Sequence, residues 1–562
     1  MYDLQHRLPA FPPVRLGSWH RHRSVSQEFD DIELRPGPSS MARTPVRFHV
    51  GIRMEQILGP LPAGTRKTKI VCAIGPSCSS VEMLGELLDA GMNVARLNFS
   101  HGDHELHLRS LSNLREAVQA RPNCHCAVLL DTKGPEIRSG FLRGHRPVLL
   151  KAGQTLEITT DYAVEGDSSR IACTYEHLPT SVVAGSRILC DDGSLAMTVL
   201  ECRDDSILVR VLNDHVLEEK KNMNLPGAAI KIPGITKKDE DDLINFAIPH
   251  AVDIVSGSFV RSAANVRAIR QCLGKKGRYI RVHAKIESLE ALRNIDEIIA
   301  EADGIHVSRG DLGMELAPQQ VFLAQKMIIH KANMAGKPVV TSTQLLQSMT
   351  KKPHPSNAEC TDVANAVLDG TDAMMLSAET AKGKYPRESV ETMARICLEA
   401  ERALDYKELF RVTRARVARP FGLCEVIASS ATEVSIDVQA KLIISLTQSG
   451  SSAKLLAKYR PEARILAVTS SGSLARQLAG VSRGVSVMQV DEMRGVDSLT
   501  MRAMKHAKEH GWIAAGDLIV LVHSLHDAVA GTTNVVNVIE ARLDGVVSPT
   551  SARFNRSPRA PV

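Results

Sequence analysis

The sequence has no hydrophobic run long enough to cross a membrane, because none of its apolar runs approaches the roughly 18 residues that a spanning helix needs. Aromatic residues are scarce, at 4%, and 69 Lys and Arg residues nearly balance 63 Asp and Glu residues among 562. The net charge of +6 is therefore low for this length and is not that of a nucleic-acid-binding protein. We expect neither a membrane nor a nucleic acid as a partner.

Two common nucleotide-binding motifs are also missing. The chain has neither a Walker A sequence nor a GxGxxG sequence, so loops must hold any nucleotide that it binds. The sequence contains 11 cysteines, but no two of them form a CxxC pair. This pattern argues against a zinc ribbon or a redox motif and favours the reduced thiols of a cytoplasmic protein.

The two ends of the chain show no stable periodicity. Residues 1–53 are rich in Pro, Arg, His and Ser and lack the hydrophobic segment of a secretory signal. We predict a disordered arm there, although its excess of Arg leaves import into an organelle open. Residues 546–562 are mainly Ser, Pro and Arg, which predicts a disordered tail.

Short, nearly continuous apolar runs recur through the middle of the chain, each followed by a polar cluster and then, in several cases, by a helical pattern. One such pattern opens with a Ser79-x-x-Glu82 capping box and places Leu84, Leu87 and Leu88 on one face. Strands that are apolar on both faces are typical of a buried parallel sheet. Repeated βα units of this kind predict a closed (β/α)8 barrel. The runs are 69–75, 94–100, 127–133, 253–260, 280–287, 304–310, 338–344 and 372–379.

The pattern changes in two places, which predicts an α/β protein of three domains. Residues 135–232 alternate apolar and polar positions between Gly and Asp turns, as in a small all-β domain inserted into the barrel. Residues 406–545 again alternate strand-like and helical stretches, which predicts a C-terminal α/β domain. The barrel itself then comprises residues 54–134 and 233–405.

Polar side chains follow nearly every strand of the predicted barrel, at the end where such barrels place their active sites. Lys285 and Glu287 are two residues apart on one strand, so their side chains face the same space. Asp311 follows the next strand, and carboxylates at neighbouring strand ends suit Mg²⁺. A lysine beside such a metal suits a transferring phosphoryl group. The other rim residues are Arg96, Asn98, Ser100, Asp131, Lys133, Arg309, Thr343, Gln344, Ser377 and Glu379.

Two further features of the rim concern ions. Asn98, Ser100 and Asp131 offer neutral and singly charged oxygens near one point, which favours a large monovalent cation over Mg²⁺. The glycines Gly310 and Gly313 allow backbone N–H groups to approach an anion closely.

Several long motifs resemble those of pyruvate kinases, and the resemblance runs from about residue 66 to 545. The sequence is similar in character to the cytosolic enzymes of plants and apicomplexan-like eukaryotes. The resemblance implies a cytoplasmic homotetramer that transfers the phosphoryl group of phosphoenolpyruvate to ADP, giving pyruvate and ATP, with Mg²⁺ or Mn²⁺ and K⁺ as cofactors. It also implies that the inserted domain is a small β-barrel that closes as a lid. The motifs are ARLNFSH at 95–101, LDTKGPEIR at 130–138, KIE at 285–287, RGDLG at 309–313, AQKMII at 324–329 and DVANAVLDGTDAMMLSAETAKGKYP at 362–386.

The resemblance also implies roles for individual residues. Lys285 stabilises the transferring phosphoryl group, and Thr343 lies near the proton path with Ser377. Arg96 and Lys221 contact phosphoryl oxygens, while Thr343 and the amides of Gly310 and Asp311 receive the substrate carboxylate. The remaining roles are Mg²⁺ binding by Glu287 and Asp311, K⁺ binding by Asn98, Ser100, Asp131 and the Thr132 carbonyl, K⁺ dependence linked to Glu136, and contacts on the nucleotide side by His101, Arg138 and Lys221.

The chain departs from the family pattern at a few positions without losing a catalytic group. Ser308, Ser342 and Ala378 each add one heavy atom near the rim, which predicts overpacking and a tuning of substrate affinity. The other departures are Ala73, Asn222 and Cys360.

A loop in the third domain resembles an effector loop for a phosphorylated sugar. It lies between a predicted strand and a predicted helix, where backbone N–H groups can bind phosphate. Gln448 replaces a Lys of some activated isoforms, and residues 496–501 and 524–531 lack the Trp and Arg that hold a second phosphate. We therefore expect a monophosphate sugar, or no effector, rather than fructose 1,6-bisphosphate. The loop residues are Thr447, Gln448, Ser449, Gly450, Ser451 and Ser452.

Two other functions stay open from the sequence. One is a metal-dependent lyase or aldolase that acts on pyruvate or phosphoenolpyruvate, against which the lid and the K⁺ residues count. The other is a weakly active regulatory homologue, against which the retained Lys285, Glu287, Asp311 and Thr343 count.

Overall fold

The structure is a computed structural model that describes residues 52, 54–59, 66–228, 230–524 and 533–542. The chain divides into two units, residues 1–49 and 50–562, and the first unit lies outside the described residues. The predictions of a disordered arm and a disordered tail therefore fall outside the described part of the chain, apart from residue 52. Within the described residues, no helix is long and apolar enough to cross a membrane.

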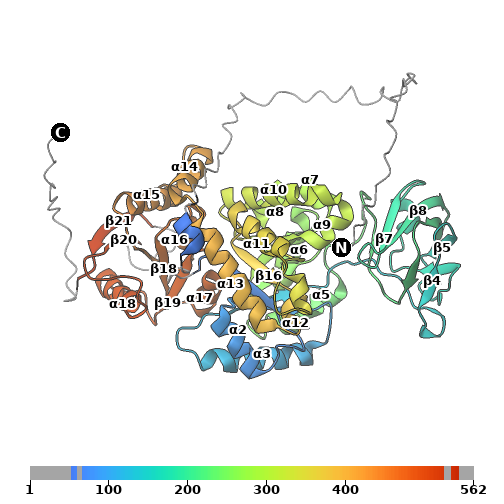
Figure 1. The fold of residues 1–562 in the computed structure, drawn as a ribbon, viewed down its shortest axis with the longest axis horizontal. Coiled ribbons are helices and arrows are strands. Elements are labelled where there is room, and N and C mark those ends of the chain that lie inside the picture. Colours follow the sequence, from blue (N-terminus) through green and yellow to red (C-terminus); the bar gives the residue numbers. More distant parts are fainter. Residues whose placement is uncertain (1–51, 53, 60–65, 229, 525–532, 543–562) are drawn as a thin grey trace, which may run out of the picture. The chain divides into compact units, whose positions relative to one another are not determined.

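Eight parallel strands close into a barrel, as the apolar runs predict (Figure 1). Each strand pairs with the barrel strand that precedes it in the sequence, and the last pairs with the first. Almost every residue in these strands is buried, which explains why the runs are continuously apolar. The strands are β1 (Lys69–Ala73), β2 (Val94–Asn98), β3 (Ala127–Asp131), β12 (Ile254–Gly257), β13 (Arg281–Ile286), β14 (Gly304–Ser308), β15 (Val339–Ser342) and β16 (Ala373–Leu376).

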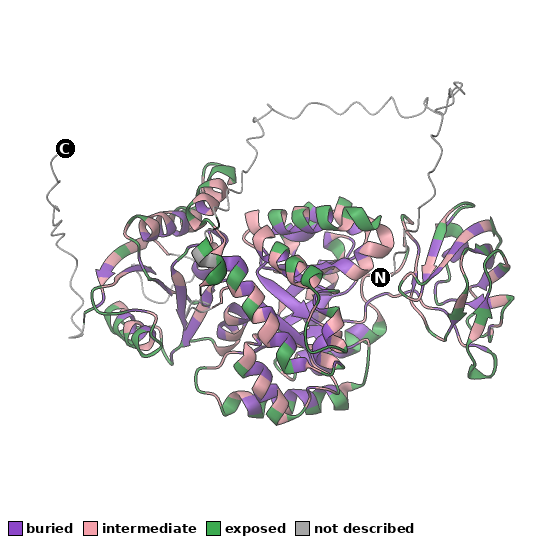
Figure 2. Ribbon diagram, in the orientation of Figure 1, coloured by how far each residue is buried: buried purple, intermediate pink, exposed green. Residues whose placement is uncertain are grey.

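Amphipathic helices surround the barrel, with buried faces toward the strands and exposed faces outward (Figure 2). The sequence prediction for α2 needs one correction, since its N-cap is Ser80 rather than Ser79. The Ser80 side chain accepts a hydrogen bond from the Met83 amide, so a single N-cap bond at Ser80 takes the place of the predicted Ser79–Glu82 capping box. These outer helices are α2 (Val81–Ala90), α3 (His104–Gln119), α6 (Ala263–Leu273), α8 (Ile295–Glu301), α10 (Val321–Met334), α11 (Asn357–Asp369) and α13 (Pro386–Arg402).

Short helical segments fill the loops of the barrel. Two of them lie at the rim, where α9 begins at Arg309 and Ser377 directly precedes α12. The segments are α1 (Met54–Leu58), α5 (Lys237–Asp241), η2 (Asp242–Ala247), α7 (Leu289–Arg293), α9 (Arg309–Glu315), η3 (Pro318–Gln320), η4 (Gln347–Thr350) and α12 (Ala378–Ala381).

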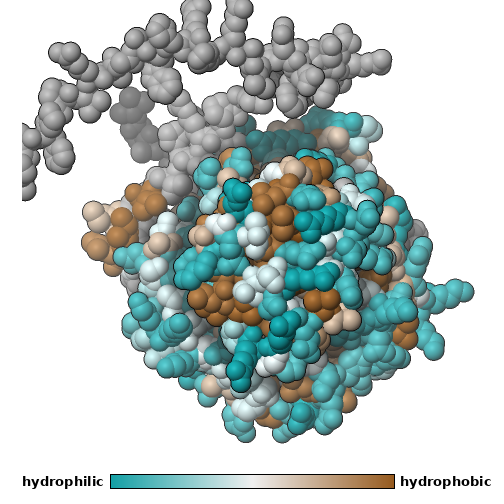
Figure 3. Space-filling model, turned by 90° about the vertical axis from the view of Figure 1, so that its right-hand side faces the viewer, coloured by the Kyte–Doolittle hydropathy of each residue, from teal (hydrophilic) through white to brown (hydrophobic). Residues whose placement is uncertain are grey.

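The inserted domain, expected as a small β-barrel, consists of a six-stranded sheet and a two-stranded sheet around its own apolar core. The six-stranded sheet has the order β11-β7-β8-β9-β5-β6 and the other pairs β10 with β4. On the face drawn in Figure 3, hydrophobic side chains lie in small groups among hydrophilic ones. The elements are η1 (Arg143–His145), β4 (Val148–Leu150), β5 (Thr155–Thr159), β6 (Arg170–Ala172), α4 (Leu178–Ser181), β7 (Arg187–Cys190), β8 (Leu195–Cys202), β9 (Ser206–Val211), β10 (His215–Leu217) and β11 (Met223–Asn224).

The C-terminal part forms a five-stranded sheet of order β19-β18-β17-β20-β21, with apolar clusters on both faces. The last strand runs antiparallel to its neighbour and was not predicted from the sequence. The domain boundaries proposed above stay a prediction. The elements are α14 (Tyr406–Arg416), α15 (Leu423–Asp437), β17 (Leu442–Leu446), α16 (Ser451–Lys458), β18 (Arg464–Thr469), α17 (Gly472–Val481), β19 (Val485–Gln489), α18 (Val496–Glu509), β20 (Leu518–His523) and β21 (Val535–Glu540).

Candidate active site

Lys285 lies near the end of β13 among three acidic residues. Its Nζ is 2.9 Å from Glu287 Oε1 and 3.4 Å from Asp131 Oδ1. Burial disfavours the ammonium form, but the charges of Asp131, Glu287 and Asp311 outweigh burial and raise the pKa of Lys285 above its ordinary value. The site therefore holds a fixed positive charge at the centre of the rim.

Asp131 links the lysine to a second cation. Arg96 Nη2 is 2.5 Å from Asp131 Oδ2, and Arg96 Nε donates to the same oxygen at 2.7 Å. Burial opposes ionisation of Asp131, yet Lys285 and Arg96 together lower its pKa to about 2. A carboxylate held ionised between two cations keeps both of them oriented into the same space.

The oxygen groups predicted to bind K⁺ lie on two paired strands. Asn98 on β2 is the register partner of Asp131 on β3, and the Ser100 amide donates to Asn98 Oδ1 at 3.2 Å. Thr132 follows Asp131 directly and is buried. The structure thus brings these four residues together at one point of the rim.

The predicted Mg²⁺ ligands form a close carboxylate pair. The side chains of Glu287 and Asp311 interact directly, and the Phe259 amide donates to Glu287 Oε2 at 2.5 Å. Burial and the neighbouring Glu287 charge raise the pKa of Asp311 to about 8. Two hard oxygen ligands in this state suit a divalent cation, which would relieve their repulsion, so the residues present fit Mg²⁺ or Mn²⁺.

Thr343 and Gly310 meet where β14 and β15 end. The Gly310 amide donates to Thr343 Oγ1 at 2.7 Å, and Oγ1 in turn donates to the Ser342 carbonyl at 2.7 Å. Ser377 follows the adjacent strand β16, where its amide donates to Glu379 Oε2 at 2.8 Å. The predicted carboxylate-binding and proton-path residues therefore come from three consecutive strands.

A cavity of about 530 Å³ lies between this rim and the inserted domain. Glu287 and Asp311 line it from the barrel and Lys221 from the inserted domain. Lys221 Nζ is 3.1 Å from Asp191 Oδ1 and 2.8 Å from Glu218 Oε2, so its charge is paired within its own domain. The cavity therefore adjoins the predicted metal ligands and the predicted phosphate contacts.

The residues predicted for the nucleotide side also line this cavity. His101 and Arg138 both contribute, and Arg138 Nε donates to Glu136 Oε2 at 2.6 Å. The carboxylate that the sequence links to K⁺ dependence is thus an ion-pair partner of Arg138.

Two of the departures from the family pattern form their own hydrogen bonds. Ser342 Oγ donates to the Val307 carbonyl at 3.0 Å. Asn222 Nδ2 donates to Asp192 Oδ1 at 2.8 Å, and Asn222 Oδ1 accepts from the Asp192 amide at 3.0 Å. Ser308 differs, because its buried Oγ has no hydrogen-bond partner among the described residues.

The loop predicted to bind an effector is ordered by its own hydroxyl groups. The Gly450 amide donates to Thr447 Oγ1 at 3.0 Å, and Ser449 Oγ and Ser451 Oγ are 3.0 Å apart. Gly450 has a φ of 80° at the start of α16. Gln448 is exposed, and of the 524–531 segment only Ser524 lies within the described residues.

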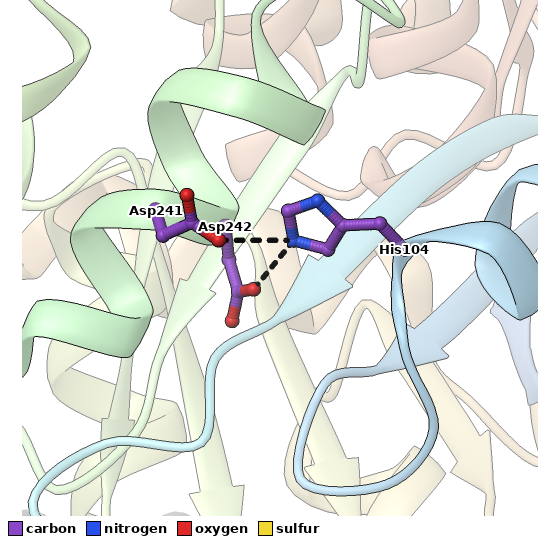
Figure 4. Close-up of side chains that lie close together, drawn as sticks. All are labelled: His104, Asp241 and Asp242. Atoms are coloured by element: carbon purple, nitrogen blue, oxygen red, sulfur yellow. Dashed lines mark hydrogen bonds and ion pairs between the residues drawn. The ribbon is translucent and has the colours of Figure 1, made fainter.

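A separate His-Asp cluster lies beside the barrel between α3 and η2 (Figure 4). His104 Nε2 is 2.8 Å from Asp242 Oδ1 and 3.7 Å from Asp241 Oδ2. Lys238 Nζ is 2.6 Å from the other Asp242 oxygen. The buried carboxylate of Asp242 already has two partners, so the cluster is explained as an ion-pair network.

The turn after β12 also belongs to the site, although it is not among the residues predicted from the sequence. Ser258 Oγ accepts a hydrogen bond from Lys285 Nζ and donates to the Thr132 carbonyl, and the Phe259 amide donates to Glu287 Oε2. Ser258 directly follows β12 and lies near the end of the predicted run 253–260, so the rule that marks the other polar strand ends also applies to it.

Comparison with known proteins agrees with this geometry. Residues 65–390 match the family described as "Pyruvate kinase, barrel domain", and residues 425–539 match "Pyruvate kinase, alpha/beta domain". A pyruvate kinase of Eimeria tenella is 50% identical over 491 residues, which cover 87% of this chain and 92% of that protein. A cytosolic isozyme of pyruvate kinase from Glycine max is 43% identical over 499 residues, 85% of this chain and 96% of that protein.

Solved structures of the same family are also similar. A pyruvate kinase from Cryptosporidium parvum superposes with a TM-score of 0.84 at 46% identity, over 87% of this chain and all 100% of that one. A Cryptosporidium parvum pyruvate kinase in complex with ADP gives a TM-score of 0.78 at 47% identity, over 87% of this chain and 98% of that one. Nothing in these comparisons supports a lyase, and the chain belongs to the pyruvate kinase family of phosphotransferases.

Proposed function

We propose that the rim of this barrel transfers the phosphoryl group of phosphoenolpyruvate to ADP, with Lys285 as the central catalytic residue. The observation that carries the assignment is the position of Lys285 Nζ, 2.9 Å from Glu287 and 3.4 Å from Asp131. The reaction consumes phosphoenolpyruvate, ADP and a proton and forms pyruvate and ATP. Because charge develops on the phosphoryl oxygens, a preorganised ammonium is most useful there.

The side-chain and backbone oxygens at the rim suggest two cation sites. Glu287 and Asp311 would hold Mg²⁺ or Mn²⁺, and Asn98, Ser100, Asp131 and the Thr132 carbonyl would hold K⁺. When bound, these ions supply positive charge beside the transferring phosphoryl group and the enolate oxygen.

The residues of the rim bind different parts of the substrate. Arg96 and Lys285 orient the phosphoryl oxygens from one side, since Asp131 fixes both cations. Thr343, with the amides of Gly310 and Asp311, receives the substrate carboxylate once the Gly310 amide and the Thr343 hydroxyl exchange their present partners for it. Proton delivery to the enolate carbon takes place on the side where Thr343 and Ser377 lie.

The nucleotide is assigned to the cavity under the inserted domain. His101, Arg138 and Lys221 line this cavity, and Arg138 and Lys221 supply cations for the phosphates of ADP. To do so, Arg138 and Lys221 exchange their present carboxylate partners for phosphate oxygens. Closure of the inserted domain would exclude water and protect the phosphoryl group from hydrolysis.

The cellular location, the oligomeric state and the effector of the enzyme are also part of the proposal. Names of plant relatives as cytosolic isozymes support a cytoplasmic location, with import through the N-terminal arm still open. We further assign a homotetramer and a phosphosugar effector at the loop of residues 447–452, both from the family resemblance.

The test is the variant Lys285→Met, which removes the charge and keeps the length of the side chain. We expect kcat to fall about 10²–10⁴-fold, the scale for one preorganised electrostatic partner. Pyruvate formation is measured in a coupled assay with and without ADP, since a lyase would not need ADP. The exposed Lys237→Met serves as a matched control that keeps full activity, and an unchanged kcat for Lys285→Met would refute the assigned role.

A further inference from the structure

Ser258 lies at the centre of the active-site network, directly after β12. Its side chain is 4% exposed. Lys285 Nζ donates to Ser258 Oγ at 2.9 Å, and Oγ is 2.7 Å from the Thr132 carbonyl oxygen and 3.3 Å from Asp131 Oδ1. A hydroxyl has one hydrogen to donate, and the shorter contact identifies the Thr132 carbonyl as its acceptor.

The backbone holds this hydroxyl in place. The Ser258 amide donates to Thr132 Oγ1 at 3.0 Å, so Ser258 and Thr132 are joined twice. Gly134 has a φ of 71°, and a Cβ there would lie 2.8 Å from Ser258 Cβ. Phe259 has a φ of 53°, in a region that non-glycine residues rarely adopt, and its amide contacts Glu287. Such a turn persists only where its surroundings determine it.

The contacts of Lys285 show why this hydroxyl matters. An ammonium group has three N–H donors. Ser258 Oγ and Glu287 Oε1 are each 2.9 Å from Nζ, whereas Asp131 Oδ1 is 3.4 Å away. The contact with Ser258 is a hydrogen bond that directs one N–H of the ammonium, whereas Glu287 Oε1 is an ion-pair partner that receives no hydrogen bond among the described residues. Removing one of these contacts would free the ammonium to swing about its stem.

We propose that Ser258 is a positioning residue that couples the monovalent-cation site to Lys285. The Thr132 carbonyl belongs to the oxygen groups assigned above to K⁺, so this inference rests on the proposed function. A carbonyl oxygen has two lone pairs, and Ser258 uses one of them. A shift of this carbonyl on cation binding passes through Ser258 Oγ to Lys285 Nζ. K⁺ therefore acts on the direction of the lysine as well as on the local charge.

The test compares Ser258→Ala with Ser256→Ala in the full chain. Ser256 is a buried neighbour on β12 whose Oγ lies 3.2 Å from His306 Nδ1, so its loss removes a buried hydroxyl without touching Lys285. Steady-state rates are measured against phosphoenolpyruvate and against K⁺. The thermal midpoint of each substrate-free protein is measured in KCl and in tetramethylammonium chloride of equal concentration.

For Ser258→Ala we expect kcat to fall about 10–100-fold, as for a misplaced catalytic group. The KM for phosphoenolpyruvate should stay within about threefold, because Ser258 does not touch substrate in the proposed mechanism. The K⁺ concentration for half-maximal rate should change by about threefold or more, and the K⁺-specific thermal shift should shrink. Ser256→Ala should keep the parental kcat and thermal shift.

An unchanged kcat and K⁺ response in Ser258→Ala overturns the inference, and so does an equal loss in Ser256→Ala. If the alanine variant does not fold, Ser258→Cys carries the test, because a thiol fills the site but is a weak hydrogen-bonding group. If the parent protein forms no pyruvate with ADP present, the proposed function fails instead, and the two failures are therefore distinct.

Discussion

The guanidinium group of Arg309 fixes the backbone of Thr343, donating to its carbonyl oxygen from Nη2 at 2.7 Å and from Nε at 3.2 Å. Thr343 has a φ of 69° and Gln344 a φ of 53°, so two consecutive residues lie in the left-handed region. That conformation costs roughly 1–2 kcal/mol per residue. Arg309 offsets the cost with a further bond to the Gln344 carbonyl at 2.7 Å, and its Nη1 pairs with Asp362 Oδ2 at 2.7 Å.

Replacing Arg309 with Lys should therefore impair substrate binding and turnover through Thr343. A lysine keeps the charge but cannot donate to both carbonyl groups and to Asp362 at once. We expect kcat/KM for phosphoenolpyruvate to fall about 10²-fold, the scale of a small misplacement at the reacting centre. Asp362→Asn is the matched control, because it keeps the shape and weakens only the ion pair. A loss in Asp362→Asn as large as in Arg309→Lys would contradict the backbone role.

The hydroxyl groups of Ser308 and Ser342 should have opposite effects on stability. Ser308 and Ser342 are register partners on β14 and β15, and both are buried. Ser342 Oγ donates to the Val307 carbonyl, whereas Ser308 Oγ has no partner among the described residues. An unsatisfied buried hydroxyl costs about 1–3 kcal/mol, and a satisfied one contributes about 1 kcal/mol.

Ser308→Ala should therefore raise the midpoint of thermal unfolding, and Ser342→Ala should lower it. Differential scanning calorimetry of both variants and the parent, at one protein concentration and salt, gives the comparison. A lower midpoint for Ser308→Ala would show that this hydroxyl has a partner, such as an ordered water.

The sequence predicts the barrel well because its strands are buried on both faces and a polar residue lies at or just after the end of nearly every one. The run 127–133 is apolar up to Asp131, and that pattern is visible without any tertiary information. The same rule places Asp131, Asp311 and Thr343 on one rim.

The sequence does not reveal how the rim residues contact each other. The bond from Ser258 to Thr132 joins positions 126 residues apart, and the bond from Arg309 to Thr343 joins positions 34 apart. Both contacts join residues far apart in the sequence, so no local sequence pattern predicts them. The shifted cap at Ser80 has a local cause, since two consecutive serines offer the same capping oxygen and only the backbone decides between them.

The pH dependence of stability should reflect a buried histidine pair in the barrel. His283 Nδ1 and His306 Nε2 are 3.1 Å apart, and both side chains are buried. Burial lowers the pKa of His283 to about 4 and holds the pKa of His306 well below its ordinary value. In the unfolded chain both would titrate near 6.5. The unfolded state then binds more protons below pH 6.5, so acid destabilises the fold.

We expect each of these histidines to remove about 1.4 kcal/mol of stability per pH unit between about pH 6.5 and pH 4. His283→Met removes one titrating group, so its thermal midpoint should fall less than that of the parent between pH 7.5 and pH 5.5. The exposed His354→Gln is the control and should follow the parent. Parallel pH profiles for the parent and His283→Met would mean that His283 accepts a proton in the folded state.

The effector loop should respond to a monophosphate sugar more than to a bisphosphate, or to neither. Its hydroxyl groups and the N-terminus of α16 suit one phosphate. Gln448 supplies no positive charge, and residues 496–501 lack the Trp and Arg of bisphosphate-activated isoforms. A second phosphate would then remain unpaired beside neutral side chains, which offsets the gain from a second contact.

Any activation by glucose 6-phosphate should shift the half-saturating phosphoenolpyruvate concentration about fivefold or more, the lower end of common allosteric coupling. Saturation curves at fixed ADP, with each sugar at equal concentration, measure this shift. Ser451→Asp adds a like charge at the loop and should abolish it, while strong and selective activation by fructose 1,6-bisphosphate would show that the pocket recruits a basic residue from elsewhere in the chain.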